Sequence, residues 1–396
     1  MWRGHPRPRA WSVTNLSTTH VTKPLSEESA IASIGLFLMI NTFETGGSER
    51  QCALLANHAN AARFQVHVGC VNPRGPLADQ FGNYEQFPLG GSLFGWTALR
   101  TRWALGGYLR RKLIQVAHAF DFYTNLTLIP SARLARVPVV IGSHRQLGDL
   151  LTPAQFRAQM AMFRWCDALV CNSQAGADRL AASGVAREKL AVIGNALPGA
   201  VFETTVPALP PNGNRRVTMI ARMNAHYKNH AGFLRIAAEV HKRLPAAEFL
   251  LVGDGPLRAE IEQHTADLGL SQQVIFLGDR RDIAAILASS DISVLTSDSE
   301  GLSNVILESM AAGVPVVAYA VGGNPELVND ERGALIPAGN EREFAGAICR
   351  LLSDANQRRA KGRNARAFAE HNFSLAHVCR QYEDLYTRLL EGKRRR

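Results

Sequence analysis

Long hydrophobic runs are missing from this chain of 396 residues. The best candidate, residues 31–40, is roughly half as long as the ~20-residue stretch that a membrane-spanning helix needs. We therefore expect no transmembrane helix, and we predict that residues 31–40 form a buried strand. The first thirty residues contain several arginines but no apolar stretch, so a secretory signal is not expected. Residues 1–30 are predicted to be a disordered, basic arm.

Patterns for disulfides, metals and redox cofactors are also scarce. The six cysteines form no C-x-x-C pair, and the twelve histidines form no H-E-x-x-H. Cysteines scattered in apolar surroundings indicate buried thiols in a reducing cytoplasm. No G-x-G-x-x-G follows residues 31–40, which disfavours a dinucleotide redox cofactor. We predict a cytoplasmic protein with no metal site and no bound cofactor.

Negative charge is in short supply, with 34 Asp and Glu against 44 Lys and Arg, for a net charge of +10. This balance suits nucleotide diphosphates, membrane surfaces or nucleic acid. No helix-turn-helix, RNP-type or zinc-finger pattern is present, so nucleic acid is not an expected partner. Residues 96–112 combine Arg and Lys with Trp and Tyr and contain no acid, a composition that favours an anionic membrane face. A solvated helix with buried aromatic residues is the alternative.

Strand-like and helix-like stretches alternate along the chain, which predicts an α/β fold with parallel sheets in doubly wound domains. A Pro- and Gly-rich linker at residues 205–214 separates a first domain, 31–204, from a second, 215–374. Residues 375–396 are predicted to be a terminal helix with a basic tail. The expected strands include residues 31–40, 65–71, 113–117, 137–142, 168–172, 216–220, 248–252, 274–277, 292–295 and 314–319.

The most informative segment has two carboxylates, Glu300 and Glu308, eight positions apart around a turn that contains Gly301. Glycine lets backbone approach a ligand closely, and the positive end of the following helix suits a phosphate. Glu308 falls about two turns along that helix, within reach of sugar hydroxyls on a nucleotide that lies across the helix start. The residues that open this helix are Leu302, Ser303 and Asn304.

Three further loops follow predicted strands, at the edge where ligands of open α/β sheets bind. Arg222 and Lys228 are two cations on one loop, suited to gripping two phosphates. Gly253 and Asp254 form a tight turn, in which Asp254 either contacts a ligand or caps the next helix. The last pair, Gly46 and Gly47, offers backbone amides from the first domain.

In order and spacing these motifs resemble the GT-B-fold glycosyltransferases of the retaining family 4, from about residue 31 to residue 390. The pair Glu300 and Glu308 is similar to the family's acidic pair, and Arg222-x5-Lys228 to its diphosphate clamp. The resemblance implies two Rossmann-like domains that face each other across a cleft, with the last helix packed back on the first domain. It also implies hexosyl transfer, as in bacterial polysaccharide or glycolipid biosynthesis.

The implied donor is a UDP- or GDP-linked sugar, and the implied acceptor is a hydroxyl of a glycan or lipid-linked glycan. The resemblance implies retention at the anomeric carbon without a metal ion, in a protein that is cytoplasmic or peripheral on the inner membrane face. Glu300 would contact the donor sugar and Glu308 the ribose. His118 and His144, which follow first-domain strands, would contact sugar or acceptor, although Phe120 stands where the family often has a second histidine.

Two other functions fit parts of the same evidence. A nucleotide-sugar epimerase shares the architecture, but it would need acid–base groups around the sugar. A non-catalytic membrane scaffold would agree with residues 96–112 and with Phe120, but it has no need for Arg222, Lys228 and the two glutamates.

Overall fold

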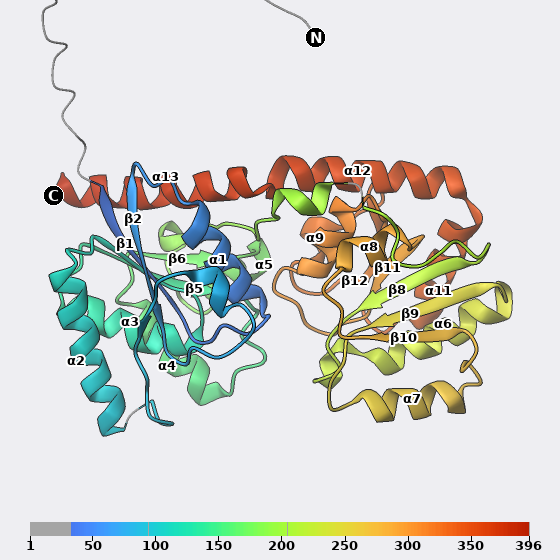
Figure 1. Ribbon diagram of the computed structural model, residues 1–396, viewed down its shortest axis with the longest axis horizontal. Coiled ribbons are helices and arrows are strands. Elements are labelled where there is room, and N and C mark those ends of the chain that lie inside the picture. Colours follow the sequence, from blue (N-terminus) through green and yellow to red (C-terminus); the bar gives the residue numbers. More distant parts are fainter. Residues whose placement is uncertain (1–32, 94, 204, 396) are drawn as a thin grey trace, which may run out of the picture. The chain divides into compact units, whose positions relative to one another are not determined.

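The computed structural model describes residues 33–93, 95–203 and 205–395. The predicted arm at residues 1–30 lies outside this part of the chain. Two parallel sheets organise the described residues (Figure 1), with strand orders β3-β2-β1-β4-β5-β6-β7 and β10-β9-β8-β11-β12-β13. Each sheet belongs to a Rossmann-like domain, so the predicted fold class is confirmed.

The first sheet contains β1 (Ile34–Ile40), β2 (Phe64–Cys70), β3 (Glu85–Gln86), β4 (Val116–Ala119), β5 (Val139–His144), β6 (Ala168–Cys171) and β7 (Leu190–Val192). The second contains β8 (Arg215–Ile220), β9 (Ala247–Val252), β10 (Val274–Gly278), β11 (Ile292–Leu295), β12 (Val316–Tyr319) and β13 (Gly333–Ile336). The helices are α1 (Gly47–His58), α2 (Trp96–Arg111), α3 (Phe122–Leu134), α4 (Pro153–Phe163), α5 (Gln174–Ala182), α6 (His230–Arg243), α7 (Arg258–Asp267), α8 (Ile283–Ala288), α9 (Asn304–Ala311), α10 (Asn324–Leu327), α11 (Glu341–Ser353), α12 (Ala355–Phe373) and α13 (Leu375–Arg394).

Strand β1 shows why the first sheet lies inside its domain. Successive side chains of a strand point to opposite faces. Leu36 and Leu38 belong to the core beneath α1 and α13, whereas Phe37 and Met39 belong to the core beneath α2 and α3. Both faces are therefore covered, which explains an apolar run without polar alternation. Figure 1 shows α13 along the first domain and α12 along the second.

Several predicted boundaries need correction. The strand expected at residues 113–117 begins only at Val116, because Leu113 takes a left-handed conformation (φ 51°) and its N–H bonds back to Arg110. The strand expected at residues 31–40 is β1, which begins at Ile34. Strand β13 was not predicted, because four residues that begin with glycine give little β signal.

The chain connects the two domains at two places. Residues 205–214 form no helix or strand among the described residues, and they bond to the second domain through Ala208 N–H and Ala285 O (2.9 Å). The second connection is at Ser374, between α12 and α13, where Leu197 and Ser374 form an isolated bridge. Helix α13 then places Tyr382 and Tyr386 in the first-domain core. In the part of the chain that the structure describes, no helix is long and apolar enough to cross a membrane.

Candidate active site

A cavity of about 350 Å³ is lined by residues from both domains. Its walls are formed by the loops that follow β1, β5, β8 and β11, together with the start of α9. The carboxyl ends of parallel strands are the expected place for a ligand. Of the residues predicted from the sequence, those that line the cavity are Gly46, Gly47, Arg222, Lys228, Gly253, Glu300, Gly301, Leu302, Ser303, Asn304 and Glu308.

Glycines let the two domains approach each other closely at this cavity. A Cβ atom on Gly47 would lie 3.0 Å from Nδ2 of Asn304, which belongs to the other domain. A Cβ atom on Gly301 would lie 2.5 Å from the carbonyl oxygen of Arg145, again across the cleft. A larger residue at position 301 would clash with the backbone of Arg145, and one at position 47 would require the Asn304 side chain to move, so the glycines allow the start of α9 to lie against the first domain.

Helix α9 supplies the part of the site suited to an anion. Ser303 caps its start and accepts a hydrogen bond from the N–H of Ile306 (3.3 Å). The other N–H groups of the first turn have no partner within the helix, and the helix dipole makes this end positive. Because the helix begins at the cavity wall, a phosphate placed there would meet several backbone donors.

The two glutamates of the acidic pair each contact a cation. Glu300 accepts a hydrogen bond from Nζ of Lys228 (2.7 Å), and both belong to the second domain. Glu308 forms an ion pair with Arg50 of α1 (3.1 Å), which crosses the cleft. Burial raises the pKa of Glu308, and the charge of Arg50 partly offsets that rise. Both glutamates line the cavity, Glu300 in the loop before α9 and Glu308 within the helix.

The expectation that His118 and His144 face the cleft is wrong, since neither lines the cavity. The His118 ring is fully buried between Tyr386 of α13 (Nδ1 to the hydroxyl, 2.7 Å) and Ser143 (Nε2 to Oγ, 2.8 Å). Burial lowers its pKa to about 3. His144 is also buried, and its Nδ1 pairs with Gln159 of α4 (3.2 Å). Burial lowers the pKa of His144 to about 4, so both rings are neutral parts of the core.

Asp254 also lies outside the cavity lining. Its carboxylate accepts a hydrogen bond from the N–H of Gly255 (2.7 Å) and lies 3.5 Å from Arg258. These contacts are local to the turn before α7. The N-cap position of α7 is Leu257, with no side-chain cap, so the carboxylate of Asp254 neither caps this helix nor lines the cavity.

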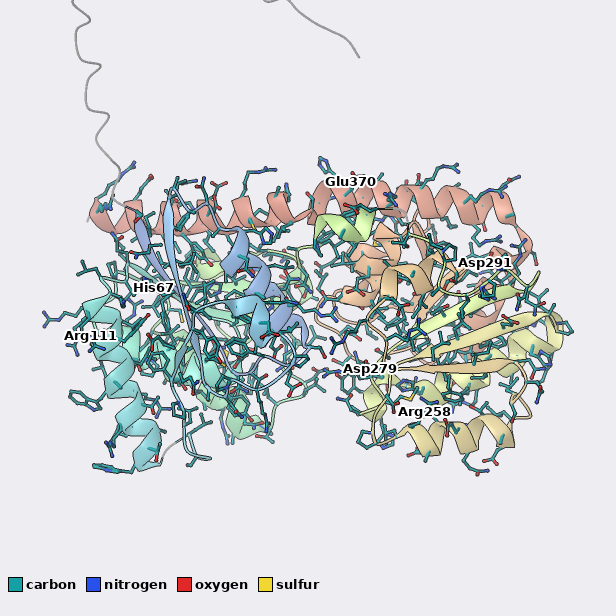
Figure 2. The ribbon with its side chains drawn as sticks, in the orientation of Figure 1. His67, Arg111, Arg258, Asp279, Asp291 and Glu370 are labelled. Atoms are coloured by element: carbon teal, nitrogen blue, oxygen red, sulfur yellow. The ribbon has the colours of Figure 1, made fainter. Side chains whose placement is uncertain are left out.

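Other cavity residues were not among the predicted site residues. Arg50 and Arg145 come from the first domain, and Asp279 and Arg280 follow β10 in the second. Figure 2 labels Asp279 at the β10 end that points toward the first domain. Arg145 follows the end of β5 directly, so the rule that placed His144 at the sheet edge also points to its neighbour.

Comparison with known proteins identifies the family. The Glycosyltransferase Family 4 profile matches residues 45–198, and the profile described as Glycosyl transferases group 1 matches residues 214–354. The chain is 30% identical over 249 residues to the lipopolysaccharide core biosynthesis glycosyltransferase LpsE of Rhizobium meliloti (strain 1021). That match covers 63% of this chain and 69% of LpsE. The chain belongs to the group 1 glycosyltransferases of family 4.

Further relatives resemble parts of this glycosyltransferase. It is 36% identical over 155 residues to N-acetyl-alpha-D-glucosaminyl L-malate synthase of Bacillus anthracis, a match that spans only 39% of each chain. It is 26% identical over 309 residues to the UDP-Gal:alpha-D-GlcNAc-diphosphoundecaprenol alpha-1,3-galactosyltransferase of Escherichia coli, covering 72% of this chain and 78% of that protein. Anabaena HepE, solved in complex with UDP, shares the fold with a TM-score of 0.77 at 22% identity, over 89% of this chain and 99% of HepE.

Proposed function

We propose that this glycosyltransferase moves a sugar from a nucleotide-diphosphate sugar to a hydroxyl of a glycan or lipid-linked glycan, with retention at the anomeric carbon. One observation carries the proposal. The cavity brings together Arg222 and Lys228, the start of α9, and the carboxylates of Glu300 and Glu308, which are groups suited to phosphates and to sugar hydroxyls. Support for the donor class comes from HepE, which was solved with UDP and with UDP-glucose, and from the galactosyltransferase of Escherichia coli, whose name includes UDP-Gal.

In the proposed complex the diphosphate lies between the start of α9 and the loop that carries Arg222 and Lys228. Glu308 accepts hydrogen bonds from the ribose, and Glu300 orients the donor sugar. Gly46 and Gly47 close on the donor from the first domain. A loop of two small residues can do so because it leaves its backbone N–H groups open to the ligand.

The proposed step breaks the bond between the anomeric carbon and the β-phosphate oxygen. Arg222, Lys228 and the α9 amides stabilise the negative charge that grows on the departing diphosphate. The acceptor oxygen bonds to the anomeric carbon on the same face, and its proton moves to the oxygen that has just left. The leaving group thus serves as the base, and the charge of Arg222 and Lys228 does the work that a divalent metal does elsewhere.

Incubation of the protein with UDP- and GDP-sugars and a glycan or lipid-diphosphate acceptor tests this proposal. The expected product is an α-linked glycan from an α-linked donor, identified by the NMR coupling of its anomeric proton, with EDTA present throughout. An inverted linkage would overturn retention, and activity that requires Mg²⁺ or Mn²⁺ would overturn metal independence. An epimerised donor without acceptor would identify an epimerase, and absence of any turnover with bound nucleotide would favour a scaffold.

We also propose that the enzyme works at an anionic membrane surface, with α2 as the contact. Trp96 and Trp103 are 76% and 70% exposed, although tryptophan is usually mostly buried. They lie seven positions apart, about two helical turns, and therefore on one side of the helix. Exposed Arg100 lies between them, and exposed Arg110 and Arg111 follow at the helix end. Aromatic rings and cations on one side of a helix fit the headgroup region of an anionic leaflet.

A further inference from the structure

Arg145 is a cation in the cavity that the proposed reaction has not used. It follows β5 directly, and its guanidinium donates to two neutral groups. Nη1 donates to the hydroxyl of Tyr382 in α13 (3.1 Å), and Nη2 donates to Oδ1 of Asn195 (2.5 Å). An arginine side chain has five N–H donors, so these two hydrogen bonds leave capacity for a ligand.

The charges of the cavity residues divide into two groups. Arg50 pairs with Glu308, Lys228 with Glu300, and Arg280 with Asp282 just outside the lining. By contrast, no carboxylate of a described residue lies within 4.0 Å of Arg145 or of Arg222. Arg145 is half-buried and its hydrogen-bond partners are neutral, so an anion bound beside it would gain a charge-assisted contact.

Arg145 and Arg222 also face the same region, although they belong to different domains. Burial raises the pKa of Glu49, and the charges of Arg222 and Arg145 both act to lower it. Glu49 lies in the first turn of α1, immediately after the Gly46–Gly47 loop. The charges of both arginines therefore reach Glu49, and both side chains line the same cavity.

A short chain of hydrogen bonds leads from Arg145 to the phosphate-binding helix start. Asn195, which accepts from Arg145, donates through Nδ2 to Oδ1 of Asn304 (2.7 Å) and to the carbonyl of Leu302 (3.2 Å). Only the Asn195 side chain separates the guanidinium from the first residue of α9. This places the charge of Arg145 close to the start of α9, where the proposed diphosphate lies.

Phe120 and Tyr382 hold the guanidinium in place. Its carbon lies 5.8 Å from the centre of the Phe120 ring, a distance at which an aromatic face attracts a cation. Phe120 stands where the family resemblance leads us to expect a second histidine. In this chain the aromatic ring at that position supports the guanidinium of Arg145. With Tyr382 and Asn195 on its other sides, Arg145 has a fixed direction before any ligand arrives.

We infer that Arg145 binds the distal phosphate of the nucleoside diphosphate from the first domain, opposite Arg222, and that Tyr382 is a positioning residue that aims it. The inference rests on the proposed function, since it requires a nucleoside diphosphate in the cleft. It gives the departing diphosphate a charged partner in each domain. It also makes the last helix of the chain part of the donor site.

Calorimetric binding of UDP and UMP, and of GDP and GMP, tests the inference, because each pair differs only in the distal phosphate. Loss of a charge-assisted contact predicts that Arg145→Gln weakens diphosphate binding by about 10- to 100-fold, with monophosphate binding changed by less than about threefold. Tyr382→Phe keeps the ring and removes one hydrogen bond, so its diphosphate loss should be about 3- to 10-fold. Exposed Arg157 of α4 is the matched control, and Arg157→Ala should change the affinity for neither the diphosphate nor the monophosphate.

Equal losses for both nucleotides, or no loss for either, would mean that Arg145 only holds Asn195 and α13 together. If Arg145→Gln does not fold, Arg145→Lys and Tyr382→Phe decide the question. Arg145→Lys keeps the positive charge but loses the planar guanidinium with its paired N–H donors. Its affinity for the diphosphate should therefore lie between those of wild type and Arg145→Gln. Wild-type protein that binds no nucleotide would overturn both the proposed function and this inference. If wild type binds a diphosphate and the variants keep the same ratio of diphosphate to monophosphate affinity, the inference alone would be overturned.

Discussion

Arg222 and Lys228 both bring positive charge to the cavity, but they differ in whether a carboxylate pairs with them. Lys228 is already paired with Glu300 at 2.7 Å, whereas no carboxylate of a described residue pairs with Arg222. Replacing either residue by alanine should lower the turnover number by about 10²–10³, because each would remove charge that stabilises the departing diphosphate. The measurement is initial rate at saturating donor, with thermal unfolding as a check of the fold.

The matched control is Arg243→Ala, which removes an exposed arginine from the end of α6 in the same domain. Turnover should stay near that of wild type in this variant. If Arg222→Ala and Lys228→Ala both kept activity within about threefold of wild type, the loss would be far below that expected for a transition-state contact, and the clamp would be refuted.

The burial of His118 should make the stability of the protein depend on pH. Burial lowers its pKa from 6.5 to about 3 in the folded protein, so between these values the unfolded chain binds a proton that the folded chain does not. Its contribution to stability is complete above pH 6.5 and is lost as the pH falls. The free energy of unfolding of His118→Gln should therefore depend less steeply on pH, by about 1.4 kcal/mol per pH unit between about pH 4 and 6.

Denaturant unfolding at several pH values measures this difference. Other groups also titrate in the range: burial raises the pKa of Asp121 to about 6, which acts in the opposite direction. Such contributions are common to both proteins and cancel in the comparison. Parallel curves for variant and wild type would show that His118 is solvated in the folded state, contrary to its two buried hydrogen bonds.

At the scale of single elements, α2 carries the proposed membrane contact. Arg102 bonds to the carbonyl of Leu126 (3.1 Å), so it belongs to the domain rather than to the surface. Arg100, Arg110 and Arg111 are exposed, and each is worth about 1 kcal/mol near an anionic leaflet. The protein should pellet with anionic vesicles at low salt, release at high salt and ignore zwitterionic vesicles.

Changing Arg100, Arg110 and Arg111 to serine should abolish pelleting without reducing nucleotide binding. The control removes the same charge from α12 and α13, where Arg363, Arg380 and Arg388 are also exposed. If both triple variants lose pelleting equally, the attraction comes from net charge alone. If wild type never pellets, α2 is an ordinary solvated helix and the acceptor is soluble.

The elements also show which parts of the fold could be predicted from sequence. Residues 292–295 form a strand with the predicted limits, because a short β-branched run between turn residues is a local signal. The start of β4 was misplaced because the left-handed turn at Leu113 leaves no sign in the apolar pattern. His118 was misplaced for a longer-range reason. The His118 ring is hydrogen-bonded to Tyr386, which lies 268 positions away on α13, and periodicity within β4 does not reveal that contact.

The same distinction applies to the site. Glycines, paired carboxylates and the Arg222–Lys228 spacing are local, and the structure brings them to one cavity. Arg145 was missed because its surroundings are assembled from distant residues. Its partners Asn195 and Tyr382 lie 50 and 237 positions away, and a motif search along the chain does not connect them.

At the scale of the whole molecule, contacts between residues of the two domains join them across the cleft. Glu326 of α10 accepts hydrogen bonds from the backbone N–H groups of Gln174 (2.8 Å) and Ala175 (3.0 Å), at the start of α5 in the first domain. A carboxylate at a helix N-terminus is favoured by the helix dipole. Together with the Arg50–Glu308 pair, this contact joins the domains around the cavity.

Glu326→Gln keeps the size of the side chain but removes the charge that favours closure. Transfer requires both domains to meet the donor, so kcat/KM should fall by roughly three- to tenfold, as expected for about 1 kcal/mol of partly solvated interaction. Glu370→Gln is the control, since Glu370 is exposed on α12, away from the cavity lining (Figure 2). Steady-state kinetics on both variants is the measurement. A kcat/KM in Glu326→Gln equal to that of the control would mean that closure does not depend on the α5 contact, leaving the donor and the Arg50–Glu308 pair to hold the domains together.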